Sequence, residues 1–129
     1  MNIADVLARI PDRREIDEDA SIMDAIDVMS MTHSTCLLVT DREGHGIGIL
    51  SEHDIVKAFA AEGDNAKTSY ICDYMTTRII AVHEGDDIET VIDLMTDKNI
   101  RHIPVMKEDG EIAGFLSIME LLAARKQHA

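Results

Sequence analysis

Two short motifs combine residue types that could bind a polar ligand. Ser51 is followed three residues later by Asp54, and Ser117 is followed at the same spacing by Glu120. One interpretation is a capping box at the start of a helix, whose usual residue three positions after the serine is glutamate or glutamine, so Glu120 fits it better than Asp54. The other is ligand binding, because a carboxylate can accept hydrogen bonds from two neighbouring hydroxyl groups. The spacing alone leaves both interpretations open.

A basic pair and a histidine could add positive charge to such a site. Arg101 and His102 directly precede the apolar run 103–106. They are either a solvated basic pair or a phosphate-binding pair, since a guanidinium makes a two-pronged contact and a histidine adds a further donor. His53 lies inside the Ser51 motif, where a helix N-terminus favours anions. For His53, a plain surface position is the simpler interpretation.

Other kinds of chemistry lack their usual motifs. The histidines and cysteines show neither a histidine pair at i, i+4 nor a CxxC spacing, which argues against a metal site. The glycine-rich run 44–48 leads into a strand and does not match a phosphate-binding loop. No nucleophile elbow and no HExxH motif occurs in the sequence. We therefore expect no metal, no required cofactor and no enzymatic activity.

Composition and charge narrow the class of protein and of partner. The chain has 129 residues, of which 46% are hydrophobic and 3% aromatic, and this predicts one compact unit with an aliphatic core. Its net charge of −13 repels nucleic acids and anionic membrane surfaces. Neither a membrane span nor a signal peptide is indicated, so we expect a cytoplasmic protein. Cys36 and Cys72 are expected to be reduced, although a single disulfide also fits their number.

An internal repeat organises the chain. At an offset of 66 residues, which pairs Ile22 with Ile88, the match runs without a gap from about residue 16 to residue 56. Two copies favour packing against each other over an open solenoid, which needs three or more units. The identities fall at core, turn and polar positions: Glu18/Glu84, Ile26/Ile92, Asp27/Asp93, Met29/Met95, Val39/Val105, Gly44/Gly110, Gly48/Gly114, Leu50/Leu116 and Ser51/Ser117.

Both copies predict the same order of elements, strand, helix, strand, strand, helix. Ser21 and Asp87 suit helix N-caps, and apolar residues follow them at i, i+3, i+4 and i+7. A hairpin comes next, and a second helix begins after Ser51 and after Ser117. The predicted class is α/β (α+β). The segments are an N-terminal helix and lead-in (1–14), repeat 1 (15–63), a linker with a short helix (64–78) and repeat 2 (79–126).

The duplicated β-α-β-β-α unit resembles the cystathionine beta-synthase (CBS) domain, and the tandem resembles a Bateman module. The likeness covers nearly the whole chain, shows no attached catalytic domain, and is carried by 48–54, 114–120, 74–76 and 101–105. It implies two repeats packed with pseudo-two-fold symmetry. It also implies two clefts for adenosyl compounds such as AMP, ADP, ATP, NAD(H) or S-adenosylmethionine, and a regulatory role such as energy sensing.

The resemblance also implies roles for single residues. In one cleft Ser51 and Asp54 hold the ribose hydroxyls, Arg101 and His102 reach the phosphates, and His53 lies nearby. The second cleft combines Ser117 and Glu120 with Thr35 and Cys36. Glu120 is longer than the aspartate of the family pattern, and Thr35 and Cys36 are neutral. We therefore predict one competent phosphate-bearing site and one weaker site.

These observations favour a regulatory module in which an adenine nucleotide changes the surface presented to a partner protein. Such a ligand acts only through its different affinities for two arrangements of the protein. The alternative is a structural interaction protein that dimerises without a ligand. A homodimer is expected in either case, because the second helix of each repeat has apolar edges to bury: Ile55, Phe59, Leu121 and Leu122.

Overall fold

The structure of the chain is a computed structural model, which describes residues 1–10 and 14–128. It divides into two compact units. The first-repeat unit is residues 14–79, and the second-repeat unit joins the described residues 1–10 to residues 80–128. Chain length alone predicts one compact unit. Two form because each repeat encloses an apolar core of its own.

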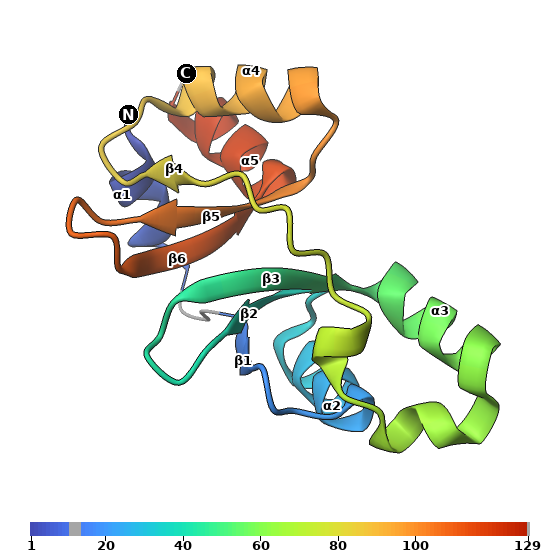
Figure 1. The fold of residues 1–129 in the computed structure, drawn as a ribbon. Coiled ribbons are helices and arrows are strands. Elements are labelled where there is room, and N and C mark those ends of the chain that lie inside the picture. The colour runs from blue at the N-terminus through green and yellow to red at the C-terminus, as the bar shows by residue number, and fades with distance from the viewer. Residues whose placement is uncertain (11–13, 129) are drawn as a thin grey trace. The chain divides into compact units, whose positions relative to one another are not determined.

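The first-repeat unit has a three-stranded sheet in the order β1-β2-β3, with β1 parallel and β3 antiparallel to β2. Its core lies between the sheet and two helices, and Leu37, Val39 and Leu50 are fully buried there. Figure 1 shows these elements in blue and green: β1 Glu15–Asp17, α2 Ile22–Thr32, β2 Cys36–Thr40, β3 Gly46–Ser51 and α3 Glu52–Glu62.

The second-repeat unit repeats this topology with the sheet order β4-β5-β6. The predicted β-α-β-β-α order is thus confirmed in both copies. The first strand of this copy has only two residues. The elements are α1 Ile3–Leu7, β4 Val82–His83, α4 Ile88–Lys98, β5 His102–Met106, β6 Ile112–Ser117 and α5 Ile118–His128.

Local signals place the helix starts and the hairpin turns. The Ser21 side chain accepts from the backbone N–H of Asp24, and the Asp87 side chain accepts from that of Glu89, so both residues are N-caps as predicted. Gly44 and Gly110 turn the two hairpins with φ of 85° and 89°, a backbone conformation that favours glycine.

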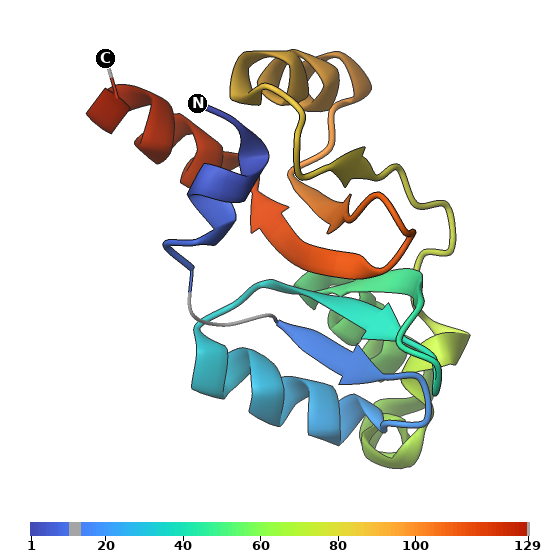
Figure 2. The same cartoon turned by 90° about the vertical axis from the view of Figure 1, so that its left-hand side faces the viewer.

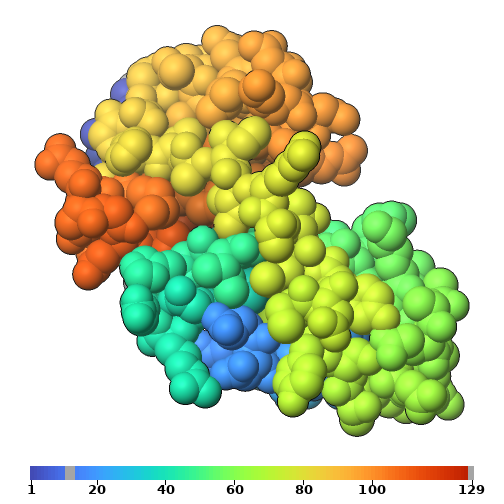
Figure 3. Space-filling model, viewed as in Figure 1, coloured from blue at the N-terminus to red at the C-terminus, as the bar shows by residue number. Residues whose placement is uncertain are grey.

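Each repeat is completed by the segment that precedes the other repeat in sequence. Helix α1 lies beside α5 and β6 (Figure 2), and Ile3 and Val6 are buried in the core of the second-repeat unit. Residues 64–78, expected as a linker with a short helix, contain two 3₁₀ helices, η1 Gly63–Thr68 and η2 Ile71–Asp73. Figure 3 shows this green-to-yellow segment at the surface of the first-repeat unit, where Ala66 and Ile71 are buried.

Two glycines at equivalent positions of the repeats leave space for side chains from these preceding segments. A Cβ atom on Gly48 would lie 2.4 Å from Sδ of Met75, and one on Gly114 would lie 2.6 Å from Cδ2 of Leu7. The glycine that recurs in the middle of each hairpin's second strand therefore makes room for a side chain from outside the repeat. None of the described helices is long and apolar enough to cross a membrane.

Candidate functional site

Ser51 and Asp54 form a capping box at the start of α3. The Ser51 backbone N–H and its Oγ hydroxyl donate to Oδ2 of Asp54 at 2.9 and 3.0 Å, and the Asp54 N–H donates to Ser51 Oγ at 3.3 Å. The capping interpretation is thus confirmed for this motif. Asp54 is only 7% exposed, and Oδ1 of Asp54 accepts no hydrogen bond from the described residues. The carboxylate therefore keeps one oxygen for a further donor.

The pairing of β2 with β3 brings Thr35 and Cys36 next to Ser51 and the start of α3. Cys36 lies opposite Ser51, and the Thr35 carbonyl accepts a hydrogen bond of 2.9 Å from the Glu52 N–H. Burial, together with the negative charge of Asp54, raises the pKa of the Cys36 thiol to about 12. The thiol is therefore neutral at physiological pH, as the sequence analysis assumes.

Two further residues flank this cluster. His53 is exposed on the first turn of α3, in agreement with the surface interpretation. Arg14, which the sequence analysis did not single out as a binding residue, lies where the chain enters β1, and its carbonyl accepts from the Leu38 N–H at 2.9 Å. No spacing motif marks Arg14, because a strand pairing far along the chain brings it to β2.

The second repeat builds the equivalent cluster from different side chains. The Ser117 N–H donates to Oε1 of Glu120 at 2.8 Å, and the Glu120 N–H donates to Ser117 Oγ at 3.2 Å. These two bonds form a capping box, the interpretation that Glu120 fits better than Asp54. His102 lies opposite Ser117, and the Arg101 carbonyl accepts from the Ile118 N–H at 2.8 Å.

The His102 ring stacks on a buried aromatic side chain. Its centroid lies 5.5 Å from that of Phe115, with an angle of 21° between the ring planes. Stacking fixes the orientation of the imidazole, whereas the neighbouring Arg101 is exposed to solvent. An exposed guanidinium on an ordered strand end is free to meet an anion without losing a buried contact.

Within the units, the structure groups the predicted site residues by repeat. Ser51, Asp54, Thr35 and Cys36 lie in the first-repeat unit, and Ser117, Glu120, Arg101 and His102 lie in the second-repeat unit. The predicted clefts combine residues of both repeats, and that combination stays a prediction.

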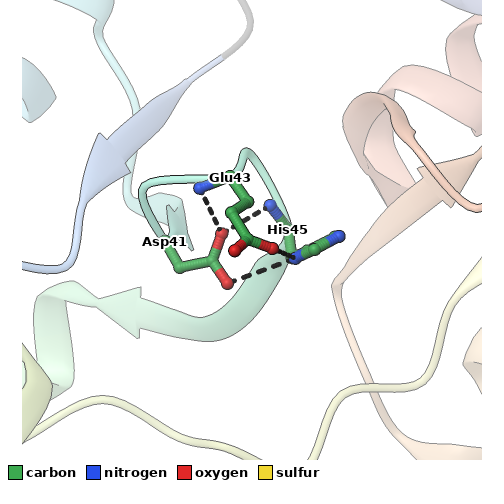
Figure 4. A network of polar contacts seen from close by, with 3 residues as sticks. All are labelled: Asp41, Glu43 and His45. Atoms are coloured by element: carbon green, nitrogen blue, oxygen red, sulfur yellow. Dashed lines mark hydrogen bonds and ion pairs between the residues drawn. The ribbon is translucent and has the colours of Figure 1, made fainter.

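The loop between β2 and β3 holds a separate polar network. Oδ1 of Asp41 accepts from the N–H groups of Glu43 and His45, both at 2.9 Å, and Nδ1 of His45 lies 3.3 Å from Oδ2 of Asp41 (Figure 4). The hydrogen bonds from the His45 and Glu43 N–H groups hold the pKa of Asp41 below its usual value. In the described part of the chain, no group of three or more histidine, cysteine or acidic residues could hold a metal ion.

Comparison with known proteins identifies the repeated unit. The family model of the CBS domain matches residues 5–61 and again residues 71–127. The chain belongs to the CBS-domain family. It carries two CBS domains in tandem, as the repeat and its motifs predict.

Curated relatives share sequence with most of this chain. The CBS domain-containing protein CBSX3 of Arabidopsis thaliana, described as mitochondrial, is 32% identical over 111 residues, which cover 82% of this chain and 53% of that protein. The first three curated relatives extend further, since the matches span 63%, 44% and 53% of their lengths.

Two solved structures have a fold similar to that of this chain. The CBS-domain containing protein ATU1752 from Agrobacterium tumefaciens has a TM-score of 0.85 at 29% identity, over 97% of this chain and 99% of that one. The CBS domain pair of protein MJ0100 was solved in complex with 5′-methylthioadenosine and S-adenosylmethionine. It has a TM-score of 0.83 at 25% identity, over 100% of this chain and 98% of that one.

Proposed function

We propose that this CBS pair is a regulatory module that binds an adenosyl ligand and transmits its occupancy to a partner protein. The observation that carries the proposal is the buried Asp54 carboxylate, which Ser51 holds through Oδ2 while Oδ1 accepts no bond from the described residues. The adenosyl compounds bound by the CBS pair of MJ0100 support the same ligand class.

Asp54 has the chemistry that ribose recognition requires. A carboxylate accepts hydrogen bonds from both vicinal hydroxyl groups, and these bonds are strong because the acceptor is charged. The capping box holds the carboxylate in place before a ligand arrives, so little side-chain freedom is lost on binding. Ser51 takes part indirectly by positioning Asp54, and its hydroxyl lies within the same cluster.

Arg101 and His102 are the proposed phosphate contacts of the ligand that Asp54 holds, with His53 as an additional donor. Arg101 is exposed at the start of β5, and a guanidinium recognises phosphate with two parallel hydrogen bonds. His102 keeps a fixed ring orientation through Phe115. This assignment follows the sequence resemblance, and the solvent exposure of the Arg101 side chain supports it.

We propose that the second site is weaker. Glu120 already uses Oε1 to accept from Ser117, and its longer side chain places the carboxylate differently from that of Asp54. Thr35 and Cys36, the residues that would face its phosphates, bring no positive charge, and Cys36 is a buried neutral thiol. A titration should therefore find one strong site rather than two equal ones.

A thermal-shift panel tests the proposal. AMP, ADP, ATP, NADH and S-adenosylmethionine are each added to the wild type and to Asp54→Asn, in which the amide oxygen can still accept from the Ser51 N–H. A ligand at 100 times its dissociation constant stabilises the fold by about 2.7 kcal/mol, which raises the melting temperature by several degrees. We expect this rise with at least one compound in the wild type and its loss in Asp54→Asn.

The matched control is Asp24→Asn, because Asp24 occupies the same capping-box position in α2. This control should keep the ligand response of the wild type. If no compound shifts the wild type at millimolar concentration, or if Asp54→Asn responds like Asp24→Asn, the proposed site is wrong.

Apolar groups on the helices of the first-repeat unit favour a second proposal, that two copies associate. Met31 and Val56 are 81% and 63% exposed. Val56 also lines a groove of about 690 Å³ between α2 and α3, together with Ile26, Met29 and Ile55. Leu121, predicted to help form such an edge, is instead fully buried in the core of the second-repeat unit.

Sedimentation of the wild type and of Val56→Glu tests this association. A dimer that Val56→Glu converts to a monomer supports it, and a wild-type monomer contradicts it. If the wild type dimerises and no nucleotide shifts its melting temperature, the structural interaction protein becomes the better account.

A further inference from the structure

Arg14 has an unusual backbone conformation. Its φ is 54°, in the left-handed region that few residues other than glycine adopt. The other described non-glycine residues with positive φ are His33 and Asn99, and each ends a helix as its C-cap, where this conformation is common. Arg14 instead directly precedes strand β1.

Such strain persists only where the surrounding structure holds it, and it is common at sites that bind ligands. Pairing with β2 helps to hold the backbone of Arg14 in place. The Leu38 N–H donates to the Arg14 carbonyl at 2.9 Å, and the next residue, Glu15, pairs with Leu38 in the β1–β2 ladder. The backbone of Arg14 is thereby fixed beside β2, two residues from Cys36.

Arg14 and Ser51 lie at the same end of the first-repeat sheet, because Glu15 pairs with Leu38 and Cys36 pairs with Ser51. The Nε atom of Arg14 is buried, so the base of the guanidinium lies inside the protein surface. The charge of Arg14 lowers the pKa of the Cys36 thiol, while the charge of Asp54 raises it. Cys36 lies opposite Ser51 in the sheet, so a positive and a negative group act on the same residue of this cluster.

We propose that Arg14 is a specificity-determining residue that makes the Ser51–Asp54 site prefer phosphate-bearing adenosyl ligands over uncharged ones. This inference rests on the proposed function, because it assumes that Asp54 binds the ribose. The carboxylate accepts from hydroxyl groups, and the guanidinium donates to phosphate oxygens. A single unit thus supplies a recognition group for each end of a nucleotide.

The second repeat lacks this group. At the 66-residue offset that pairs Ile22 with Ile88, Arg14 corresponds to Ile80, an apolar residue that is 39% exposed. The presence of Arg14 in one repeat and Ile80 in the other gives the two repeats unequal selectivity for phosphate. This effect is independent of Glu120. It also predicts that selectivity for phosphate follows the first repeat.

Isothermal titration with AMP and with adenosine tests the assignment on the full chain. The ratio of the two affinities isolates the phosphate contribution, because both ligands carry the same ribose and base. Arg14→Gln should lower the AMP preference at least about tenfold, since a hydrogen bond to a charged group is worth about 1.5–3 kcal/mol. Its affinity for adenosine should stay as in the wild type, and Arg14→Lys should restore part of the preference.

The matched control is Arg42→Gln. Arg42 is an exposed cation of the same unit, and its nearest acidic partner is Asp19 at 3.8 Å. It should keep the wild-type ratio. An unchanged ratio in Arg14→Gln, or an equal loss of both affinities with a lowered melting temperature, overturns the role of Arg14 while leaving the site standing. A wild type that binds neither compound overturns the proposed function and this inference together.

Discussion

Cys36 lies directly opposite Ser51 on the ladder formed by β2 and β3. The second repeat holds His102 opposite Ser117 at the equivalent position. The duplication has therefore kept the backbone pairing and changed the chemistry beside the serine. A buried neutral thiol stands in one repeat, and an imidazole stacked on Phe115 stands in the other.

Alkaline pH should destabilise the protein through Cys36. Its pKa in the folded chain is about 12, raised from an ordinary value of 9.0. The stabilisation by the neutral thiol is complete below pH 9 and is lost as pH rises toward 12, because the unfolded chain releases this proton first. Urea denaturation between pH 8 and about pH 11 measures this loss. Cys36→Ala should show a flatter decline, and an equal decline in both proteins would contradict the assignment.

The two thiols should differ in reactivity. Cys72 is exposed and Cys36 is buried, and both are free cysteines. Because the thiolate is the reactive form, a thiol reagent such as Ellman's reagent should modify Cys72 in the folded protein and Cys36 only after unfolding. We expect one reactive group per chain in buffer and two in denaturant. Rapid release of two equivalents without denaturant would show that the Cys36 environment opens readily.

Substitution of Gly114 by alanine should disturb the packing of α1. The new Cβ would lie 2.6 Å from Cδ2 of Leu7, so the leucine must move. Overpacking of this kind costs about 1–3 kcal/mol, measured as a fall in the free energy of unfolding in urea. Gly85→Ala is the matched control, since nothing lies within 4 Å of the added atom. The double variant Leu7→Ala, Gly114→Ala should be more stable than the sum of the single effects, and strict additivity would exclude the contact.

Local sequence patterns predicted most helices and strands of each repeat, because the residues that determine each element lie close together in the chain. The capping residues Ser21, Ser51 and Asp87 begin helices where expected, and Gly44 and Gly110 turn the predicted hairpins. Because the two copies align at an offset of 66 residues, a helix or strand predicted in one copy is also predicted in the other. The candidate site residues could be named for the same reason, since Ser51 and Asp54 share one turn.

Contacts between distant segments left no comparable signal. The packing of α1 in the second-repeat unit joins Leu7 to Gly114, and no periodicity links residues so far apart. Leu121 illustrates a second cause. It is an apolar residue near the start of a helix, which predicts an interface as readily as a core, and only the packing shows that it is core. The position of Arg14 beside β2 likewise depends on the parallel pairing of β1.

The same repeat equivalence leads to a stabilising substitution. His33 and Asn99 are the C-caps of α2 and α4, and both have φ of 54°. Asparagine adopts this conformation more readily than most residues, and glycine adopts it without steric cost. His33→Gly should therefore raise the free energy of unfolding by about 1 kcal/mol, a gain of several degrees in melting temperature. Asn99→Gly should gain less, and His33→Ala, which keeps the Cβ, should gain nothing. If His33→Ala stabilised the fold as much as His33→Gly, the effect would come from removing the imidazole rather than from the backbone.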